Sequence, residues 1–270
     1  MGAFFVSAPK PAHAMHITLP FILLNTALGA GLGFAGGLLG IGGGLIAIPT
    51  LAWLYGMDQH LAQGTALVMI VPNVLIGFFR YHQKHRIDLR AVAAISVFSM
   101  VAAYVAGRLA SGIDSGVLRV AFALFLVALA LYFGHGLLRK AKSRAEPAAP
   151  RQMTRSALPL LGIASGAMSG IFTIGGGLVV VPALVSLFRM EQTRAQGTAL
   201  ALVVPSSAIA LFAYAQGQHV AWDVGVPMAV GGILTVSAGV ALAHRFPAAR
   251  LRMLFCLVLL VTAGTMLVTG

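Results

Sequence analysis

The sequence predicts an all-α polytopic membrane protein with two inverted repeats of about five membrane segments each. Three observations predict this fold class. Of the 270 residues, 59% are hydrophobic and 9% are charged, against about 45–50% and about 25% in soluble chains. Short motifs of the first half return in the second half. The basic residues, 18 Lys and Arg against 6 Asp and Glu, gather in alternate loops.

Ten apolar segments follow from the rule that a bilayer core about 30 Å thick needs about 20 apolar residues per helix. A first repeat, 17–138, contains segments 17–38, 39–56, 61–80, 91–110 and 117–138. A charged, proline-containing linker at 139–156 is expected outside the membrane. A second repeat, 157–269, contains segments 157–171, 174–188, 195–215, 224–243 and 251–269. The short second segment of each half either crosses fully or is a re-entrant half-helix. Residues 1–14 are expected to form an exposed tail, because they lack the basic start and apolar core of a signal peptide.

Four ordered motifs recur at a constant offset of 133 residues. The pairs are Ile41–Leu45 with Ile174–Leu178 (both IGGGL), Pro49 with Pro182, Gln63–Leu67 with Gln196–Leu200 (both QGTAL), and Val71-Pro72 with Val204-Pro205. A chance similarity of composition would not keep four motifs in one register. The two halves are therefore expected to be structural repeats.

Loop charges predict that the second half is inverted relative to the first, since cytoplasmic loops are enriched in Lys and Arg. With the linker placed inside, the basic loops at 81–90, 189–194 and 244–252 also fall inside, whereas 111–116 and 216–223 fall outside. All basic residues except Lys10, Arg108 and Arg119 then lie on the cytoplasmic side. The loop after the third segment is basic in the first half (81–90) and has no Lys or Arg in the second half (216–223). A parallel repeat would not produce this difference. Both termini are expected outside.

The triple glycines are expected to break their helices, because each glycine costs about 1 kcal/mol relative to alanine within a helix. They are Gly42, Gly43 and Gly44 in the first half and Gly175, Gly176 and Gly177 in the second. In secondary transporters, unwound backbone at membrane depth forms the substrate site, with helix N-termini directed at anions. Two such breaks would face each other near the midplane. The alternative is that the glycines only permit close helix packing.

Neutral hydrogen-bonding side chains follow each glycine break. Gln63 and Thr65, with their copies Gln196 and Thr198, can bind an anion without bringing charge into the membrane. Asn73, Ser206 and Ser207 follow the repeated prolines and are candidates for the same cavity. The alternative is hydrogen bonding between helices or to the local backbone.

Other functional classes are disfavoured. All six acidic residues lie in loops or at helix ends, where Asp58 and Glu191 are expected to cap helices, so no buried carboxylate relay is predicted. The glycine-rich stretch lacks the strand and lysine of a phosphate loop, and Ser165 and Ser169 lack a basic partner in the membrane. His82 and His85 lack acidic or thiol neighbours for a metal. We therefore expect no enzyme, cofactor, metal or nucleic-acid partner.

The stretches Gly36–Pro49 (GGLLGIGGGLIAIP) and Ser169–Pro182 (SGIFTIGGGLVVVP), with the two QGTAL blocks, resemble the sulfite exporter TauE/SafE family of bacterial inner-membrane proteins. The resemblance covers roughly residues 20–269. It implies transport, usually export, of small sulfur-containing anions such as sulfite or organosulfonates. In a bacterial inner membrane, the termini that the loop charges place outside would be periplasmic. Carried over to this chain, it indicates a binding region at Gly42–Gly44, Gly175–Gly177, Gln63, Thr65, Gln196 and Thr198.

These observations together predict a secondary transporter that works by alternating access. A small anion would enter a midplane cavity between inverted halves, bind the glycine-break amides and the neutral side chains, and leave when the halves rock. The expected partners are this anion and the lipid bilayer, and a homo-oligomer is left open. A small-solute or anion channel and a non-transporting accessory membrane protein remain as alternatives.

Overall fold

The computed structural model describes residues 18–40, 42–85, 89–142, 157–173, 177–188, 190, 192–246 and 248–268. Within these ranges the chain forms ten helices and no strand. The helices are α1 Leu19–Leu39, α2 Gly44–Tyr55, α3 Gln59–His85, α4 Leu89–Ala110, α5 Ser115–Lys142, α6 Ala157–Phe172, α7 Gly177–Leu187, α8 Gln192–Gln216, α9 Trp222–Ala243 and α10 Ala248–Val268. The prediction of an all-α chain is confirmed, and each expected segment overlaps one helix.

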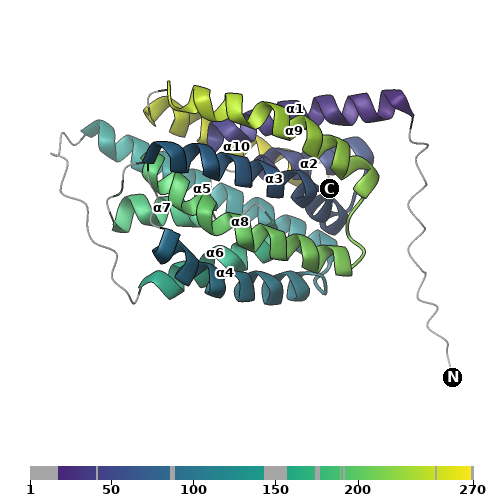
Figure 1. Ribbon diagram of the computed structural model, residues 1–270, viewed down its shortest axis with the longest axis horizontal. Coiled ribbons are helices and arrows are strands. Elements are labelled where there is room, and N and C mark those ends of the chain that lie inside the picture. Colours follow the sequence, from purple (N-terminus) through teal and green to yellow (C-terminus); the bar gives the residue numbers. More distant parts are fainter. Residues whose placement is uncertain are drawn as a thin grey trace.

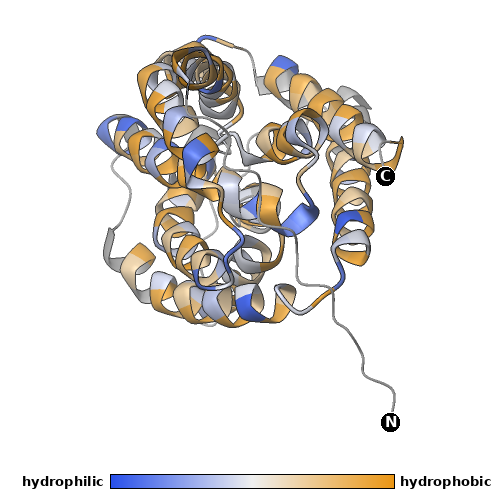
Figure 2. Ribbon diagram, turned by 90° about the vertical axis from the view of Figure 1, so that its right-hand side faces the viewer, coloured by the Kyte–Doolittle hydropathy of each residue, from blue (hydrophilic) through white to orange (hydrophobic). Residues whose placement is uncertain are grey.

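The surface of the helix bundle is apolar. Five helical stretches in the described part are long and apolar enough to cross a membrane, namely Leu19–Leu39, Gln59–Gln83, Ser115–His135, Arg194–Gln216 and Trp222–Ala243. Large apolar side chains point outward, such as Leu234 (72% exposed) and Val268 (86% exposed). Figure 2, which looks along the helices, shows hydrophobic residues around the whole periphery. Such a surface suits lipid rather than water, and the chain is a multi-pass membrane protein.

Helices of the two halves pack against each other. The most extensive contacts join α1 to α9 and α4 to α6, and α3 contacts α8 while α5 contacts α10. In Figure 1 the α1/α9 pair lies on one side of the bundle, the α4/α6 pair on the other, and α3 and α8 lie between them. The first helix of each half therefore packs on the fourth helix of the other half.

Glycines allow the helices of the α1/α9 pair and of the α4/α6 pair to approach each other closely. On α1 they are Gly29, Gly33 and Gly37, and on α6 they are Gly162, Gly166 and Gly170. A Cβ atom at Gly33 would lie 2.7 Å from the carbonyl oxygen of Gly232, and one at Gly166 would lie 2.8 Å from the carbonyl carbon of Ser99. In lipid, where no hydrophobic force draws helices together, such backbone contact supplies van der Waals packing.

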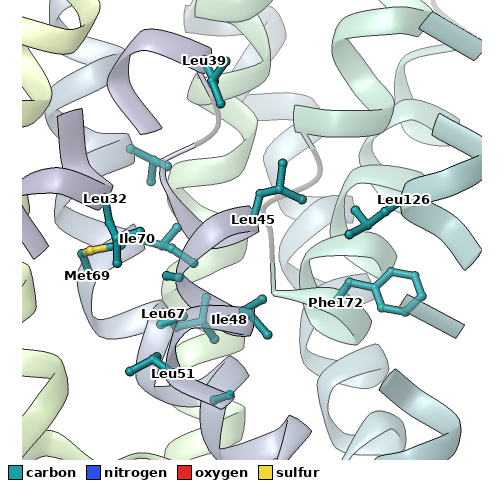
Figure 3. Packing of buried hydrophobic residues seen from close by; sticks show 14 of the residues in the cluster. Leu32, Leu39, Leu45, Ile48, Leu51, Leu67, Met69, Ile70, Leu126 and Phe172 are labelled. Carbon is teal, nitrogen blue, oxygen red and sulfur yellow. The ribbon is translucent and has the colours of Figure 1, made fainter. Parts of the chain in front are cut away.

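The chain reverses between α1 and α2, as the triple glycine predicts. Gly40, Gly42 and Gly43 have φ angles of 71°, 72° and 92°, which favour glycine. After this turn α2 runs back along α1, so that Gly43 packs against Leu32 and Gly36. Figure 3 shows Leu45, Ile48 and Leu51 of α2 within the apolar core. With 12 residues, α2 rises only about 18 Å, which is too short for a bilayer core of about 30 Å.

The second half has a corresponding short helix, α7, with 11 residues. The chain leaves α6 through Thr173, whose φ of 56° is also left-handed. Thr173 occupies the position 133 residues after Gly40. Gly175 and Gly176 lie outside the described residues, and α7 begins at Gly177.

The bundle has two distinct ends. We call the end where α5 stops and α6 starts the linker end; α3, α7 and α9 also stop there (Figure 1). At the opposite end α1, α3, α5 and α9 begin. The two ends differ in their charged and polar residues, as described below.

Candidate functional site

Two buried hydrogen bonds join α3 to α8. The Tyr214 hydroxyl donates to Oε1 of Gln63 at 2.7 Å, and the Tyr81 hydroxyl donates to Oε1 of Gln196 at 3.2 Å. All four side chains are buried. Tyr81 and Tyr214 are separated by the same 133 residues as the two glutamines. Because α3 and α8 are antiparallel, one glutamine–tyrosine pair lies toward each end of the two helices.

Each tyrosine fixes the orientation of a glutamine amide. Because the amide oxygen accepts the tyrosine proton, the NH2 group of each glutamine is turned away and remains a donor. Nε2 of Gln63 is buried and has no partner among the described residues. Nε2 of Gln196 points at the α1–α2 reversal, 3.2 Å from where a Cβ of Gly40 would lie. A buried unpaired donor costs about 1–3 kcal/mol, a cost that an anionic ligand would relieve at Gln63.

The two glutamines do not meet in one cavity. Gln63 and Tyr81 are 18 residues apart on α3, which corresponds to about 27 Å along the helix, and Gln196 lies against Tyr81. A small anion cannot contact both glutamines at once. The structure therefore does not bring Gln63 and Gln196 together as expected, and each is grouped instead with a tyrosine of the other half.

The glycine break lies at the middle of the bundle. Gly42 packs against Ile70 and Val74, on either side of Pro72 in α3. The amides of Ile46 and Ala47 donate to the Gly43 carbonyl, and the first-turn amides before them have no acceptor within the helix. The N-terminus of α2 thus directs its positive dipole end into the buried centre, which favours negative charge. In the second half Gly177 packs against Val203 and Ala199 of α8.

Most of the predicted hydroxyl groups bond to backbone. The backbone N–H of Ala221 donates to Oγ1 of Thr65 at 3.0 Å, just before α9 begins. The hydroxyl groups of Thr198, Ser206 and Ser207 donate to the carbonyls of Arg194, Leu202 and Val204 in their own helix, at 3.0, 3.0 and 3.1 Å. Thr198, Ser206 and Ser207 thus make the local backbone bonds that were the alternative to anion binding. Thr65 bonds to a distant segment of the chain.

Asn73 differs from these hydroxyl residues. Its side chain is buried, and neither Oδ1 nor Nδ2 has a partner among the described residues. It packs against α9, where a Cβ at Gly232 would lie 2.6 Å from Nδ2. Because Asn73 directly follows Pro72, it lies at the depth of the α1–α2 reversal. Its amide is therefore a second unpaired donor, and it lies nearer the centre of the bundle than Gln63 does.

Residues proposed for other chemistry do not form such sites within the described ranges. The hydroxyls of Ser165 and Ser169 are buried and have no hydrogen-bond partner among the described residues. No group of three or more His, Cys, Asp or Glu side chains that could hold a metal occurs in these ranges. Asp58 caps α3, since its Oδ1 accepts the Leu61 N–H at 2.9 Å; Glu191 lies outside the described residues.

Comparison with known proteins identifies the family of this chain. Residues 25–266 match the family model described as "Sulfite exporter TauE/SafE". The chain belongs to this family. A "Probable membrane transporter protein" of Xylella fastidiosa (strain 9a5c) is 30% identical over 236 residues, 87% of this chain and 89% of the relative. A protein so named in Methanocaldococcus jannaschii is 30% identical over 73% of each chain, and YunE of Bacillus subtilis is 24% identical over 93% of this chain and 99% of its own. The family resemblance is confirmed.

The α8–α9 loop covers the Gln63 end of this TauE/SafE protein. The backbone of His219 packs against Gly64, the residue after Gln63. The His219 ring lies 5.1 Å from the ring of His60 and 6.4 Å from that of Tyr214. Burial lowers the pKa of His219, the nearby His60 lowers this pKa further, and Asp58 partly opposes both effects. The loop is thus held in place with His219 in its neutral form.

We expect the folded state to lose stability when the pH falls below about 6.5, the pKa of an ordinary histidine. Since the pKa of His219 is lower in the folded protein, the unfolded chain binds more protons in this range, and acid favours unfolding. The contribution is fully present above pH 6.5 and is lost as the pH falls through the folded pKa. Thermal unfolding in detergent between pH 8 and 5 measures it. His219→Gln should flatten the pH dependence, and an unchanged slope would contradict the assignment.

Proposed function

We propose that this protein is a secondary transporter of small sulfur-containing anions, such as sulfite or organosulfonates, across the bacterial inner membrane. The observation that carries the proposal is the buried, unpaired amide of Gln63, whose orientation Tyr214 fixes. A neutral amide can bind a sulfur oxyanion through its N–H groups and release it again, without an intramembrane charge that would trap it. The family description as a sulfite exporter supports this substrate class.

We infer that the two halves form an inverted repeat. Gly29, Gly33 and Gly37 approach Met228, Gly232 and Val236 in turn, and their counterparts Gly162, Gly166 and Gly170 approach Ile95, Ser99 and Ala103. Every residue of the second set lies 133 positions from its counterpart in the first. The corresponding helices α3 and α8 also run antiparallel. Exchange of the two halves would preserve these contacts, which is the symmetry that alternating access uses in repeat transporters.

A stepwise path for the anion agrees best with the distance between the glutamines. Near the linker end the anion would contact Gln196, at the centre the amide of Asn73 and the N-terminus of α2, and near the opposite end Gln63. In this scheme α2 and α7 are re-entrant half-helices whose N-termini meet the anion at the middle of the membrane. The α1/α9 and α4/α6 pairs, each held by glycine contacts, would rock as units around α3 and α8.

The linker end is proposed to face the cytoplasm. Arg80, Arg194, Arg245 and Arg250 lie there, whereas Asp58, Asp114 and Asp223 lie at the opposite end. Enrichment of basic residues marks the cytoplasmic side of inner-membrane proteins. On this assignment both chain termini are periplasmic.

Fluxes into proteoliposomes test the proposal. Purified protein should carry labelled sulfite or sulfoacetate at a saturable rate, with counterflow and a preference over sulfate, and comparison with and without a pH gradient shows whether protons are coupled. Flux that fails to saturate and lacks counterflow would support a channel instead. Absence of flux for all three anions would support a non-transporting accessory protein.

A further inference from the structure

A cavity of about 670 Å³ opens at the linker end between α3 and α9. Its polar lining consists of Arg80, Gln83, Ser237, His244 and Arg245. Among the described residues, no acidic side chain lines this cavity. The cavity lies outside the group formed by Gln196, Tyr81 and the α1–α2 reversal.

Arg80 is held by a neutral partner. Its Nε donates to the Ser237 hydroxyl at 3.2 Å, so the partner seen among the described residues orients the guanidinium and carries no charge. The two terminal nitrogens of a guanidinium held in this way can bind an oxyanion through two parallel hydrogen bonds. Arg245 lines the same cavity and supplies a second positive charge.

The repeated scaffold does not require this concentration of charge. At the opposite end the positions that correspond to Arg80, Ser237, His244 and Arg245 are Ala213, Tyr104, Ser111 and Gly112. Gln83 corresponds to Gln216, whose Oε1 accepts a 3.5 Å hydrogen bond from Tyr104. Arg108 corresponds to Ala241 of the lining, so the counterpart region carries one arginine where this cavity carries two. Neither of the two arginines in the cavity lining is repeated at its counterpart position.

The cavity adjoins the candidate site through a single side chain. Tyr81 follows Arg80 in α3, its ring lies 5.0 Å from the ring of His244 in the cavity lining, and its hydroxyl donates to Gln196. The Tyr81 side chain thus contacts both His244 of the cavity lining and Gln196 of the candidate site.

We propose that the cavity between α3 and α9 is an oxyanion capture site at the linker-end mouth of the transport path. Arg80 and Arg245 bind the sulfite or sulfonate group, and Gln83 and Ser237 complete the polar lining. The cavity exceeds the size of sulfite, so it also accommodates the carbon chain of an organosulfonate. The role on the transport path rests on the proposed function, whereas the binding of an oxyanion does not.

The first test measures binding in detergent. Methanesulfonate, sulfite and phosphate are added at constant ionic strength, and the shift in thermal unfolding is recorded for wild type, Arg80→Gln and Arg245→Gln. We expect each variant to weaken the apparent affinity at least fivefold. Arg108→Gln, which removes an exposed arginine from the opposite end, should leave it unchanged. Equal affinity in wild type and in both cavity variants would overturn the proposal; Arg245→Gln retains the Arg80–Ser237 bond and serves if Arg80→Gln fails to fold.

The second test measures transport from the linker end in oriented proteoliposomes. Arg80→Gln and Arg245→Gln should raise KM at least fivefold and change the maximal rate less than twofold, because capture precedes the central step. An unchanged KM would overturn the capture role. A lipid phosphate could occupy the same cavity. In that case phosphatidylglycerol should abolish the shift in thermal unfolding that methanesulfonate causes, and the variants should leave KM unchanged in phosphatidylcholine. These two results together would show that the occupant is lipid and that the capture role is wrong. Absence of flux in wild type would contradict the proposed function, while the binding test would still decide the cavity.

Discussion

Alanine at Gly33 is expected to destabilise the protein, whereas alanine at Gly31, two residues earlier in the same helix, is expected to be tolerated. A Cβ atom at position 33 would lie 2.7 Å from the carbonyl oxygen of Gly232, and backbone lies on both sides of this contact. The added methyl group would force α1 and α9 apart, and overpacking of this kind costs about 1–3 kcal/mol. A Cβ at Gly31 meets no atom within 4 Å, and alanine there improves helix propensity by up to about 1 kcal/mol.

The free energy of unfolding in detergent and the monodisperse fraction on size exclusion compare these two variants. Gly166→Ala extends the test to the other half, because its Cβ would meet the backbone of Ser99 on α4. If the two outer helix pairs pack equivalently, Gly33→Ala and Gly166→Ala should lose similar stability. Equal stability of Gly33→Ala and Gly31→Ala would show that the α1–α9 contact adjusts without strain.

The helices themselves could be predicted from the sequence, because burial in lipid requires long apolar stretches. The breaks could also be predicted, since three consecutive glycines oppose a continuous helix. The ends of the helices were less accurate: α3 continues to His85 and α5 to Lys142, beyond the expected ends at 80 and 138. An apolar count measures the part inside the membrane, whereas backbone hydrogen bonding continues through the polar residues that follow.

The glutamine–tyrosine pairs were not predicted, because they depend on how α3 packs against α8. The sequence signal was the offset of 133 residues between Tyr81 and Tyr214, in the two segments that also carry the repeated QGTAL and Val-Pro motifs. The distance between Gln63 and Gln196 follows from the antiparallel packing of α3 and α8. Both lie one turn into their helices, and the starts of antiparallel helices lie at opposite ends. A single cavity that contains both was therefore inconsistent with the predicted inversion.

The glycines of α1 and α6 that contact neighbouring helices could have been recognised from the sequence as sites of close helix packing. Their spacing of four residues places each row on one helix face. The partner helices, α9 and α4, could not be read from this spacing, because small residues show that a close neighbour exists without showing which one. Only the three-dimensional arrangement assigns each row to the fourth helix of the other half.

Transport is expected to fall at least about tenfold in kcat/KM when either Gln63 or Gln196 is replaced by alanine. A hydrogen bond to a charged group contributes about 1.5–3 kcal/mol, which corresponds to roughly 10- to 150-fold. Gln216→Ala is the matched control, since this exposed glutamine lies on α8 outside the buried pairs. Sulfite or sulfoacetate flux into proteoliposomes measures the effect, with size exclusion as a check on folding.

A double-mutant cycle separates binding by the glutamines from positioning by the tyrosines. Tyr214→Phe removes the hydroxyl that holds Gln63 and leaves the ring, so it should reduce transport less than Gln63→Ala and add little to that variant. Tyr81→Phe acts on Gln196. Tyr81 lies about 27 Å from Gln63 along α3, so the effects of Tyr81→Phe and Gln63→Ala should be additive in free energy. Because the anion is proposed to pass the two glutamines in turn, the Gln63→Ala, Gln196→Ala double variant should also show additive losses. Unchanged transport in both single variants and in the double variant would remove these glutamines from the path.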